Sequence, residues 1–261
     1  MRHPIAVLIL CLLTSVAAGS ASAADREKLL SEPGVYGTFA VFQMDQEWWK
    51  LDKAARMAAL TEVKAALKKH GERLAIDAYL LRGLYERGDF FLRVHSTELT
   101  QTQDFLLELM GTTAGRYMKN TVTLNGITKK LNYVPAFSDE VKAALKTPLD
   151  PGLKPYAIVI PIRKDAAWWL TDQEGRTARM KEHTEASIPY LKTVKRKLYH
   201  ASGLDDVDFL TYFETAKLDD FNNLVIALER VQENRHNAQF GRPTILGTIR
   251  PIEDILEVLA R

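Results

Sequence analysis

The sequence of 261 residues contains a single cysteine, Cys11, and almost no excess of charge of either sign. One thiol can form neither a disulfide framework nor a cysteine-based metal cage. Lys and Arg number 35 and Asp and Glu number 33, so the formal net charge is +2. The composition therefore lacks the basic excess of a nucleic-acid-binding protein and the acidic blocks of a solvating tail. With 46% hydrophobic residues, 14 Gly and 10 Pro, disordered and collagen-like chains are excluded as well.

The most apolar stretch of the sequence lies at its start and covers Ile5 to Val16. It follows the polar pair Arg2 and His3 and leads into small residues that end at Ala21-Ser22-Ala23. This order is typical of a cleaved secretory signal peptide. A membrane anchor is the alternative, but the apolar run is too short to span a bilayer comfortably. We predict that residues 1–23 are removed and that the remaining chain is exported to a bacterial periplasm, without attachment to the membrane.

An internal repeat organises the rest of the chain, and a paired tryptophan marks each copy. Trp48-Trp49 is followed by Ala55-Arg56-Met57, and Trp168-Trp169 is followed by Ala178-Arg179-Met180. The similarity between the two copies continues further along the chain, where Gly83-Leu84 precedes Asp89-Phe90 and Gly203-Leu204 precedes Asp208-Phe209. The sequence therefore predicts two copies of one supersecondary unit.

The second copy shows the expected order of elements most clearly. Alternation predicts strands, helical spacing predicts helices, and Thr171 with Glu174 forms a capping box that opens the first helix. The expected elements are a strand at 156–163, a helix from 171 to 187, strands at 193–199 and 208–214, a helix at 218–231 and a strand at 244–249. This β-α-β-β-α-β order is that of a ferredoxin-like unit.

The fold class is therefore α+β, with two ferredoxin-like units packed sheet against sheet as in a dimeric α/β barrel. We expect an N-terminal unit at 24–137, a linker at 138–154 with two prolines and a glycine, and a C-terminal unit at 155–261. A short amphipathic helix at 252–259 closes the chain.

One charged side chain is expected on the apolar face of a strand. Alternation places Arg196 on the same face as Val194 and Leu198. A charge on an apolar face is costly unless it is paired or functional. Three interpretations are open: a shifted strand register, a structural ion pair, or a functional arginine with Thr211 and Phe213 on the neighbouring strand.

His183 lies on the capped helix, on a mildly apolar stripe with Met180 and Ala186. Such a histidine is either a satisfied core residue or the single proximal ligand of a haem iron. Zinc is disfavoured because no second His or Cys stands at ligand spacing. Glu233 lies off the apolar stripe of the second helix; it is either a surface carboxylate or the hydrogen-bond partner of His183.

Lys164 and Trp168 stand where the first strand of the second copy ends. An ammonium group and an indole N–H could hold the anionic propionates of a haem. The alternative for the tryptophan pair is packing, because the first copy has the pair but no histidine on its helix before His70. Any special chemistry therefore belongs to the second copy. Asp205, Asp206 and Asp208 could bind Ca²⁺ or be solvated turn residues.

Taken together, these residues resemble a known family. The stretch from Tyr156 to Ile249 is similar to the haem domain of the chlorite dismutases. The blocks that carry the resemblance are Val194–Asp206, Asp208–Thr215 and Phe221–Leu224, and Gly34–Phe39 fits the start of the long-subunit, exported branch.

The resemblance implies a haem b enzyme that converts chlorite to chloride and dioxygen and assembles as a homopentamer. His183 corresponds to the proximal ligand, Glu233 to its partner and Arg196 to the distal arginine. The other matched positions are Thr211 and Phe213 on the distal side, Lys164, Trp168 and Tyr133 beside the haem, and Trp169 near a subunit interface. Phe240 stands where some members have a tryptophan, so the ring is kept and an N–H donor is lost.

Two other functions remain open. A related haem enzyme, either a coproporphyrin-haem decarboxylase or a peroxidase-like member, is the first. The signal peptide and Arg196 argue against the decarboxylase, which is expected to be cytosolic and to lack this arginine. A non-catalytic haem-binding module is the second, and Arg196 facing a pocket with Thr211 and Phe213 argues against it.

Overall fold

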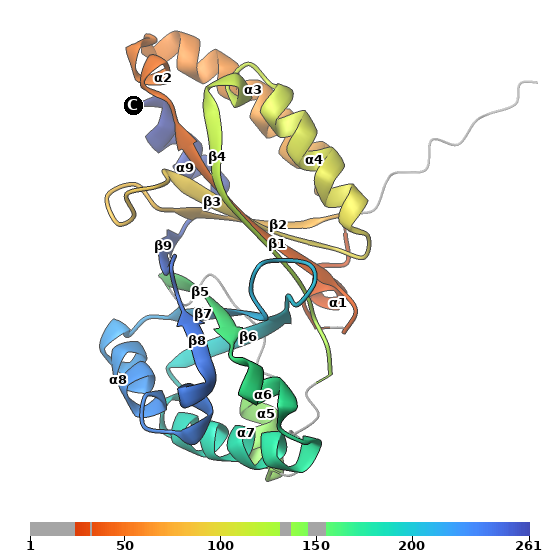
Figure 1. Ribbon diagram of the computed structural model, residues 1–261. Coiled ribbons are helices and arrows are strands. Elements are labelled where there is room, and N and C mark those ends of the chain that lie inside the picture. Colours follow the sequence, from red (N-terminus) through yellow and green to blue (C-terminus); the bar gives the residue numbers. More distant parts are fainter. Residues whose placement is uncertain (1–23, 32, 131–136, 146–154) are drawn as a thin grey trace, which may run out of the picture.

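The computed structural model describes residues 24–31, 33–130, 137–145 and 155–261 (Figure 1). The expected signal peptide and Tyr133 lie outside these residues. Among the helices that are described, none combines the length and the apolar character needed to cross a bilayer.

The first unit has the expected order of strands and helices, which confirms the α+β class. Its elements are α1 (Arg26–Ser31), β1 (Tyr36–Met44), α2 (Gln46–Lys50), α3 (Lys53–His70), β2 (Ala75–Leu80), β3 (Phe90–Ser96), α4 (Leu99–Gly111), the 3₁₀ turn η1 (Gly115–Tyr117) and β4 (Met118–Ile127). A short helix, α5 (Asp139–Leu145), lies in the segment expected to link the units.

The second unit repeats this order. Its elements are β5 (Tyr156–Lys164), α6 (Ala166–Leu170), α7 (Gln173–Ser187), η4 (Ile188–Tyr190), β6 (Val194–His200), β7 (Phe209–Thr215), α8 (Leu218–Leu228), η5 (Gln232–His236), β8 (Asn237–Phe240) and β9 (Ile245–Ile249), and α9 (Ile252–Ala260) follows it. The short helix α6, which carries the tryptophan pair, and strand β8 were not predicted.

The start of α7 corrects the predicted capping box. The N-cap is Asp172, whose carboxylate accepts a hydrogen bond from the backbone N–H of Gly175 at 2.7 Å. Thr171 instead ends α6, where its hydroxyl donates to the carbonyl of Ala167 at 2.8 Å. The first unit uses the same device, because Asp52 caps α3 through the N–H of Ala55 at 2.8 Å. The two copies therefore match down to their helix caps.

The strands of both units form one closed circuit. The hydrogen-bonded order is β7-β6-β4-β1-β3-β2-β9-β5-β8, and β5 also pairs with β7. Two short seams join the units: Ile127 pairs with His200 between β4 and β6, and Tyr79 and Leu80 pair with Ile249 and Thr248 between β2 and β9. The sheets of the two units therefore enclose a barrel, as expected, with α3, α4 and α9 outside one sheet and α7 and α8 outside the other (Figure 1).

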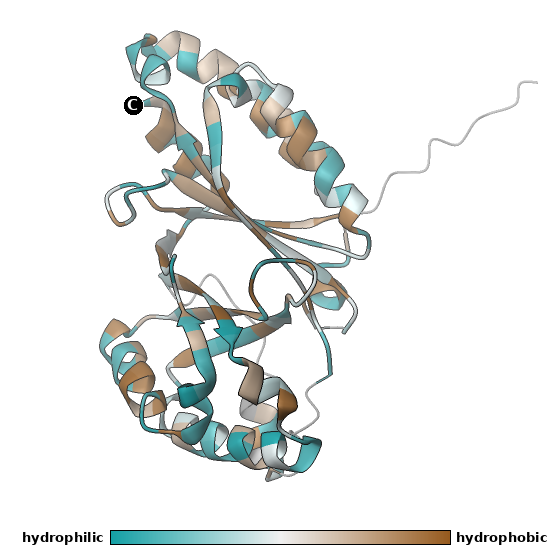
Figure 2. Ribbon diagram, in the orientation of Figure 1, coloured by the Kyte–Doolittle hydropathy of each residue, from teal (hydrophilic) through white to brown (hydrophobic). Residues whose placement is uncertain are grey.

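The barrel interior is apolar and rich in aromatic rings, and the strands at the centre of the molecule are predominantly hydrophobic (Figure 2). It also holds a buried ion pair, in which Arg93 donates to Asp77 at 2.8 Å. The Arg93 guanidinium lies 3.9 Å from the carboxylate of Glu214 on the other unit. Burial alone would raise the pKa of Asp77, but Arg93 and Arg26 bring it below its usual value. The interface between the units is thus fixed by charge as well as by apolar contact.

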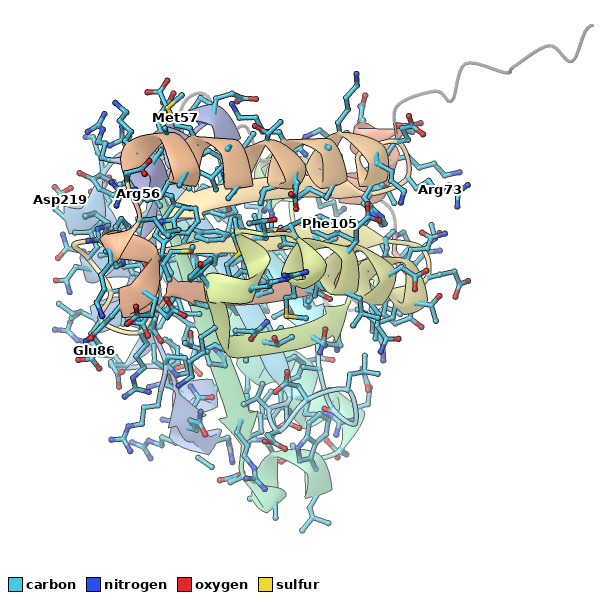
Figure 3. The ribbon with its side chains drawn as sticks, turned by 90° about the horizontal axis from the view of Figure 1, so that it is seen from above. Arg56, Met57, Arg73, Glu86, Phe105 and Asp219 are labelled. Atoms are coloured by element: carbon cyan, nitrogen blue, oxygen red, sulfur yellow. The ribbon has the colours of Figure 1, made fainter. Side chains whose placement is uncertain are left out.

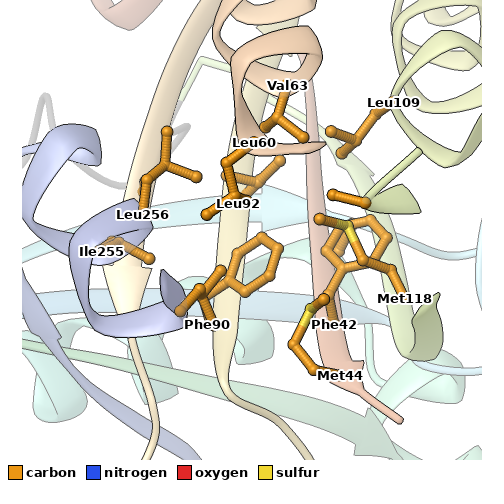
Figure 4. Close-up of a cluster of buried hydrophobic side chains, with 14 of the residues drawn as sticks. Phe42, Met44, Leu60, Val63, Phe90, Leu92, Leu109, Met118, Ile255 and Leu256 are labelled. Carbon is orange, nitrogen blue, oxygen red and sulfur yellow. The ribbon is translucent and has the colours of Figure 1, made fainter. Parts of the chain in front are cut away.

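The outer face of the first sheet is covered by α3, α4 and α9, and Figure 3 looks down on α3 and α4, with Met57 projecting outward. The close-up in Figure 4 shows Ile255 and Leu256 of α9 beside Phe90 and Leu92 of β3. The indole N–H of Trp48 donates to the carbonyl of Leu259 at 2.8 Å, which ties α2 to α9. Residues 252–260, expected within the C-terminal unit, therefore complete the core of the first unit.

Candidate functional site

Four polar side chains of the second unit gather between its helices and its sheet. Lys164 lies at the end of β5, His183 in the middle of α7 and Arg196 in β6. Glu233 lies in η5, the 3₁₀ turn that follows α8, and not on the helix itself. Because η5 packs against α7, residues fifty positions apart meet there.

His183 and Glu233 form the centre of this group. The ring Nδ1 lies 2.8 Å from Oε2 of Glu233, and both side chains are largely buried. Burial lowers the pKa of His183 to about 3, and the positive charges of Arg196 and Lys164 act in the same direction. A neutral ring beside a carboxylate carries its proton on Nδ1 and donates it to that carboxylate. The lone pair of Nε2 is therefore free to bind a metal ion.

Lys164 binds the other oxygen of the same carboxylate. Its ammonium donates to Oε1 of Glu233 and, at 2.6 Å, to the side-chain carbonyl of Asn237. It also lies 4.6 Å from the ring centre of Trp168. Burial lowers the pKa of Lys164 to about 8, although Asp165 and Asp208 raise it. The ammonium thus points at a protein carboxylate, and contact with a haem propionate remains a prediction that these contacts do not support.

Arg196 lies across the free nitrogen of His183, with Nη1 3.4 Å from Nε2. Its Nη2 is buried and has no hydrogen-bond partner among the described residues. The predicted alternation is confirmed: Val194 faces the helices and Tyr199 faces the barrel interior. In the strand pairing Arg196 stands opposite Phe213, and Leu198 stands opposite Thr211.

The two predicted pocket residues on β7 are therefore neighbours of Arg196. Phe213 is 6% exposed and makes an edge contact with Phe221, with ring centres 5.2 Å apart. Thr211 donates its hydroxyl to the carbonyl of Ile160 at 3.0 Å. Both belong to a face shared with an apolar cluster that includes Phe240.

This donor set fits a haem better than it fits a bare metal ion. One neutral imidazole offers a lone pair, and the apolar cluster beside it suits a flat hydrophobic ring. Among the described residues no group of three or more His, Cys, Asp or Glu side chains is placed to hold a metal ion. A partnerless guanidinium nitrogen faces the same space, so an anion bound there would satisfy it. To admit the haem, the Arg196 side chain has to move away from Nε2.

Among its described residues the first unit has no counterpart of this site. Counting from the capping residues Asp52 and Asp172, Val63 takes the position of His183, and Met44 takes that of Lys164. Both are buried in the cluster that α9 completes (Figure 4). Apolar side chains thus fill the space that the second unit keeps for polar chemistry.

The predicted calcium site at the β6–β7 turn gains no support. Asp205 accepts the backbone N–H of Asn125 at 2.9 Å, and Asp208 accepts that of Lys164 at 2.7 Å. The carboxylates therefore bind backbone groups of different strands and do not converge on one point.

A barrel of two ferredoxin-like units, with a buried histidine backed by a carboxylate among the described residues of only one of them, defines a class: α+β barrel proteins with one polar site in the second unit. Within that class this chain belongs to the chlorite dismutase family, whose model matches residues 56–250. It is 43% identical over 238 residues to a chlorite dismutase of Ideonella dechloratans, covering 90% of this chain and 84% of the relative.

The solved structures agree. The chlorite dismutase of Candidatus Nitrospira defluvii, in complex with imidazole, superposes with a TM-score of 0.87 and 54% identity, covering 91% of this chain and all (100%) of the other. A heme-binding protein of Thermus thermophilus reaches a TM-score of 0.74 at 18% identity, covering 88% of this chain and 96% of the other, and shares the fold.

Proposed function

We propose that this chain is a haem b-dependent chlorite dismutase, which converts chlorite into chloride and dioxygen. The observation that carries the proposal is the buried pair of His183 and Glu233 with the guanidinium of Arg196 across the free ring nitrogen. Membership of the family and the 43% identity to a chlorite dismutase support it. When bound, the haem supplies a redox-active iron at which the two oxygen atoms of chlorite leave chlorine and join each other.

The residues of the chain have separable tasks in this proposal. His183 would hold the iron through the Nε2 lone pair, while Glu233 accepts its Nδ1–H and gives the ring anionic character. Lys164 shares the charge of that carboxylate and limits this effect. Arg196 presents a planar fork of donors to a small oxyanion. Because the neighbouring side chains of this face are largely apolar, that contact is stronger than it would be in water.

Export and assembly form a further part of the proposal. The order of charged, apolar and small residues in 1–23 supports removal of a leader and a periplasmic location. The side chains of Trp169 and Leu170 on α6 are 46% and 86% exposed, which supports burial of this helix between subunits. We propose a homo-oligomer, and specifically a pentamer as the family resemblance implies.

The test of the activity is the substitution Arg196→Ala. This variant should fold and take up haem, because no other described side chain depends on Arg196 for a hydrogen bond except the contact with His183. It should release dioxygen more slowly from chlorite, as measured in an oxygen electrode. More hypochlorite should escape from the site during turnover, so the haem bleaches after fewer turnovers. Arg196→Lys keeps the charge without the fork and should fall between.

The matched control is Arg163→Ala, which removes an exposed arginine from the adjacent part of the same unit. It should retain the wild-type rate and yield. If Arg196→Ala also retains them, and a hypochlorite scavenger changes nothing, the assignment of the anion site to Arg196 is wrong.

A further inference from the structure

Asp208, at the start of β7, holds the strand that carries Lys164. One carboxylate oxygen accepts the backbone N–H of Lys164 at 2.7 Å, and the other accepts the hydroxyl of Ser202 at 2.9 Å. The backbone of Asp208 joins the same place, because its N–H donates to the carbonyl of Ile162 at 2.9 Å and its carbonyl accepts from Ala201 at 2.8 Å. The last residues of β5 are thus fixed by one aspartate.

The first unit contains the same arrangement without the polar site. Asp89 accepts the backbone N–H of Met44 at 2.7 Å, and its own N–H donates to Phe42 at 2.8 Å. Its carbonyl accepts from Leu81 at 2.8 Å. Asp89 is therefore the internal counterpart of Asp208, and the aspartate is first of all a device that fixes the end of a strand.

The two copies differ in what meets the second carboxylate oxygen. Asp89 is paired with the guanidinium of Arg82 at 2.6 Å, so its charge is neutralised. Asp208 meets the neutral hydroxyl of Ser202 at the same place. The negative charge of Asp208 therefore acts on Lys164, which stands where the first unit has Met44.

We propose that Asp208 is a positioning residue for the haem site: it fixes Lys164, and through it Glu233, so that the ring of His183 keeps its orientation, while the carboxylate of Asp208 adds negative charge near the site. The contacts form a continuous path, since Asp208 holds the backbone of Lys164, Lys164 binds Glu233 and Glu233 binds His183. This inference rests on the proposed function. It adds to that function a residue that touches neither cofactor nor substrate.

Electrostatics favour the contact between Lys164 and Glu233 on this path. Burial lowers the pKa of Lys164, whereas Asp165 and Asp208 raise it, so these two carboxylates favour the protonated lysine that binds Glu233. Asp165 has another partner in His236, at 3.1 Å. Asp208 is the one of the two that also holds the lysine backbone.

The experiment measures the ferric/ferrous midpoint potential of the haem-loaded protein at pH 6, together with its melting temperature. Asp208→Asn keeps an oxygen for the backbone N–H but removes the charge. We expect the potential to rise, because less negative charge near His183 stabilises the ferric iron less. Ser202→Arg supplies the guanidinium that Arg82 provides in the first unit. It changes an exposed residue, leaves the aspartate in place and should raise the potential in the same direction.

Asp89→Asn is the matched control, because it weakens the same backbone contact where no haem residue follows. It should lower the melting temperature about as much as Asp208→Asn and leave the potential unchanged. If Asp208→Asn and Ser202→Arg also leave the potential unchanged, Asp208 is a structural residue only and the inference is wrong. A wild-type protein that binds no haem, or does not consume chlorite, overturns the proposed function and this inference with it.

Discussion

Lys197 lies next to Arg196 in β6, yet its side chain enters the barrel while that of Arg196 faces the helices. Its ammonium donates to the carbonyl of Leu30 in α1. Burial and, to a lesser degree, the charge of Arg93 together lower the pKa of Lys197 to about 8. Two neighbours on one strand thus carry positive charge into two different environments.

A charge held at a lowered pKa makes stability depend on pH. The unfolded lysine keeps its proton up to its ordinary pKa of 10.5, whereas the folded one loses it near 8. The cost of burying the charge is therefore complete below pH 8, on the order of 3 kcal/mol, and is relieved as pH rises toward the unfolded value. Lys197→Met should be more stable than wild type in urea at pH 7, and the difference should shrink at pH 10. The exposed Lys192→Met should show no such trend.

Glu233 serves two partners, so removing it has two consequences. Glu233→Ala takes the acceptor from His183 and leaves Lys164 buried without its counter-charge. Haem should be held about 10–100-fold more weakly, and the free energy of unfolding should fall by about 3–5 kcal/mol, as when one partner of a buried ion pair is removed.

The loss of stability in Glu233→Ala should be reversed by a methionine at position 164, because the first unit has Met44 at the matching place. The double variant Lys164→Met, Glu233→Ala should regain stability in urea but not haem affinity in a titration. If stability and haem affinity recover together, the two tasks of Glu233 are not separable.

Glu233 also shows where sequence reasoning stops. Its spacing along the chain indicates a surface carboxylate, because it lies beyond the apolar stripe of α8. The 3₁₀ turn η5 brings Glu233 back against α7, and no local sequence pattern predicts that turn. Arg196, by contrast, was predictable, because strand alternation is a local property and places it with Val194.

At the scale of elements, the starts of the predicted helices agree with the structure to within two residues. Thr171 and Asp172 both suit an N-cap, and sequence alone does not decide between them. The structure decides because Thr171 is needed to end α6. That short helix was missed since five residues carry no measurable periodicity.

Helix α9 was predicted, but its place was not, because its amphipathic pattern says nothing of which sheet it covers. Leu259 is fully buried against the first unit (0% exposed). Leu259→Ala should lower the free energy of unfolding by about 2–5 kcal/mol, measured in urea, and leave the haem spectrum unchanged. Glu257→Ala, on the exposed side of the same helix, should have little effect. A changed haem spectrum in Leu259→Ala would contradict the separation of α9 from the site.

On the scale of the whole molecule, the barrel follows from the repeat, because two half-barrels with one apolar sheet face each have to cover one another. The short seams that close it were not predictable, since they involve few residues and long-range pairing.

The copies differ at their outer edges. Trp49 of the first unit is covered by the guanidinium of Arg82, 3.9 Å from its ring centre. Its counterpart Trp169 has the ring of Phe209 beside it, with ring centres 6.1 Å apart.

This difference predicts where subunits meet. Wild-type protein should have a mass of five chains by light scattering, and Trp169→Glu should dissociate it, because a charge would be buried in an apolar contact. Leu107→Glu changes an equally exposed apolar residue on α4 of the first unit and should leave the mass unchanged. A wild-type mass of one chain would contradict the assembly itself.

The position of α9 has a consequence for biosynthesis. The first unit is made early, yet one wall of its core consists of residues 252–260. While the chain is still being synthesised, the outer face of β3 stays open to any passing hydrophobic surface. Chaperones that protect nascent chains should therefore remain on the first unit until synthesis has passed the second. The part of the protein that is translated first is the part that is finished last.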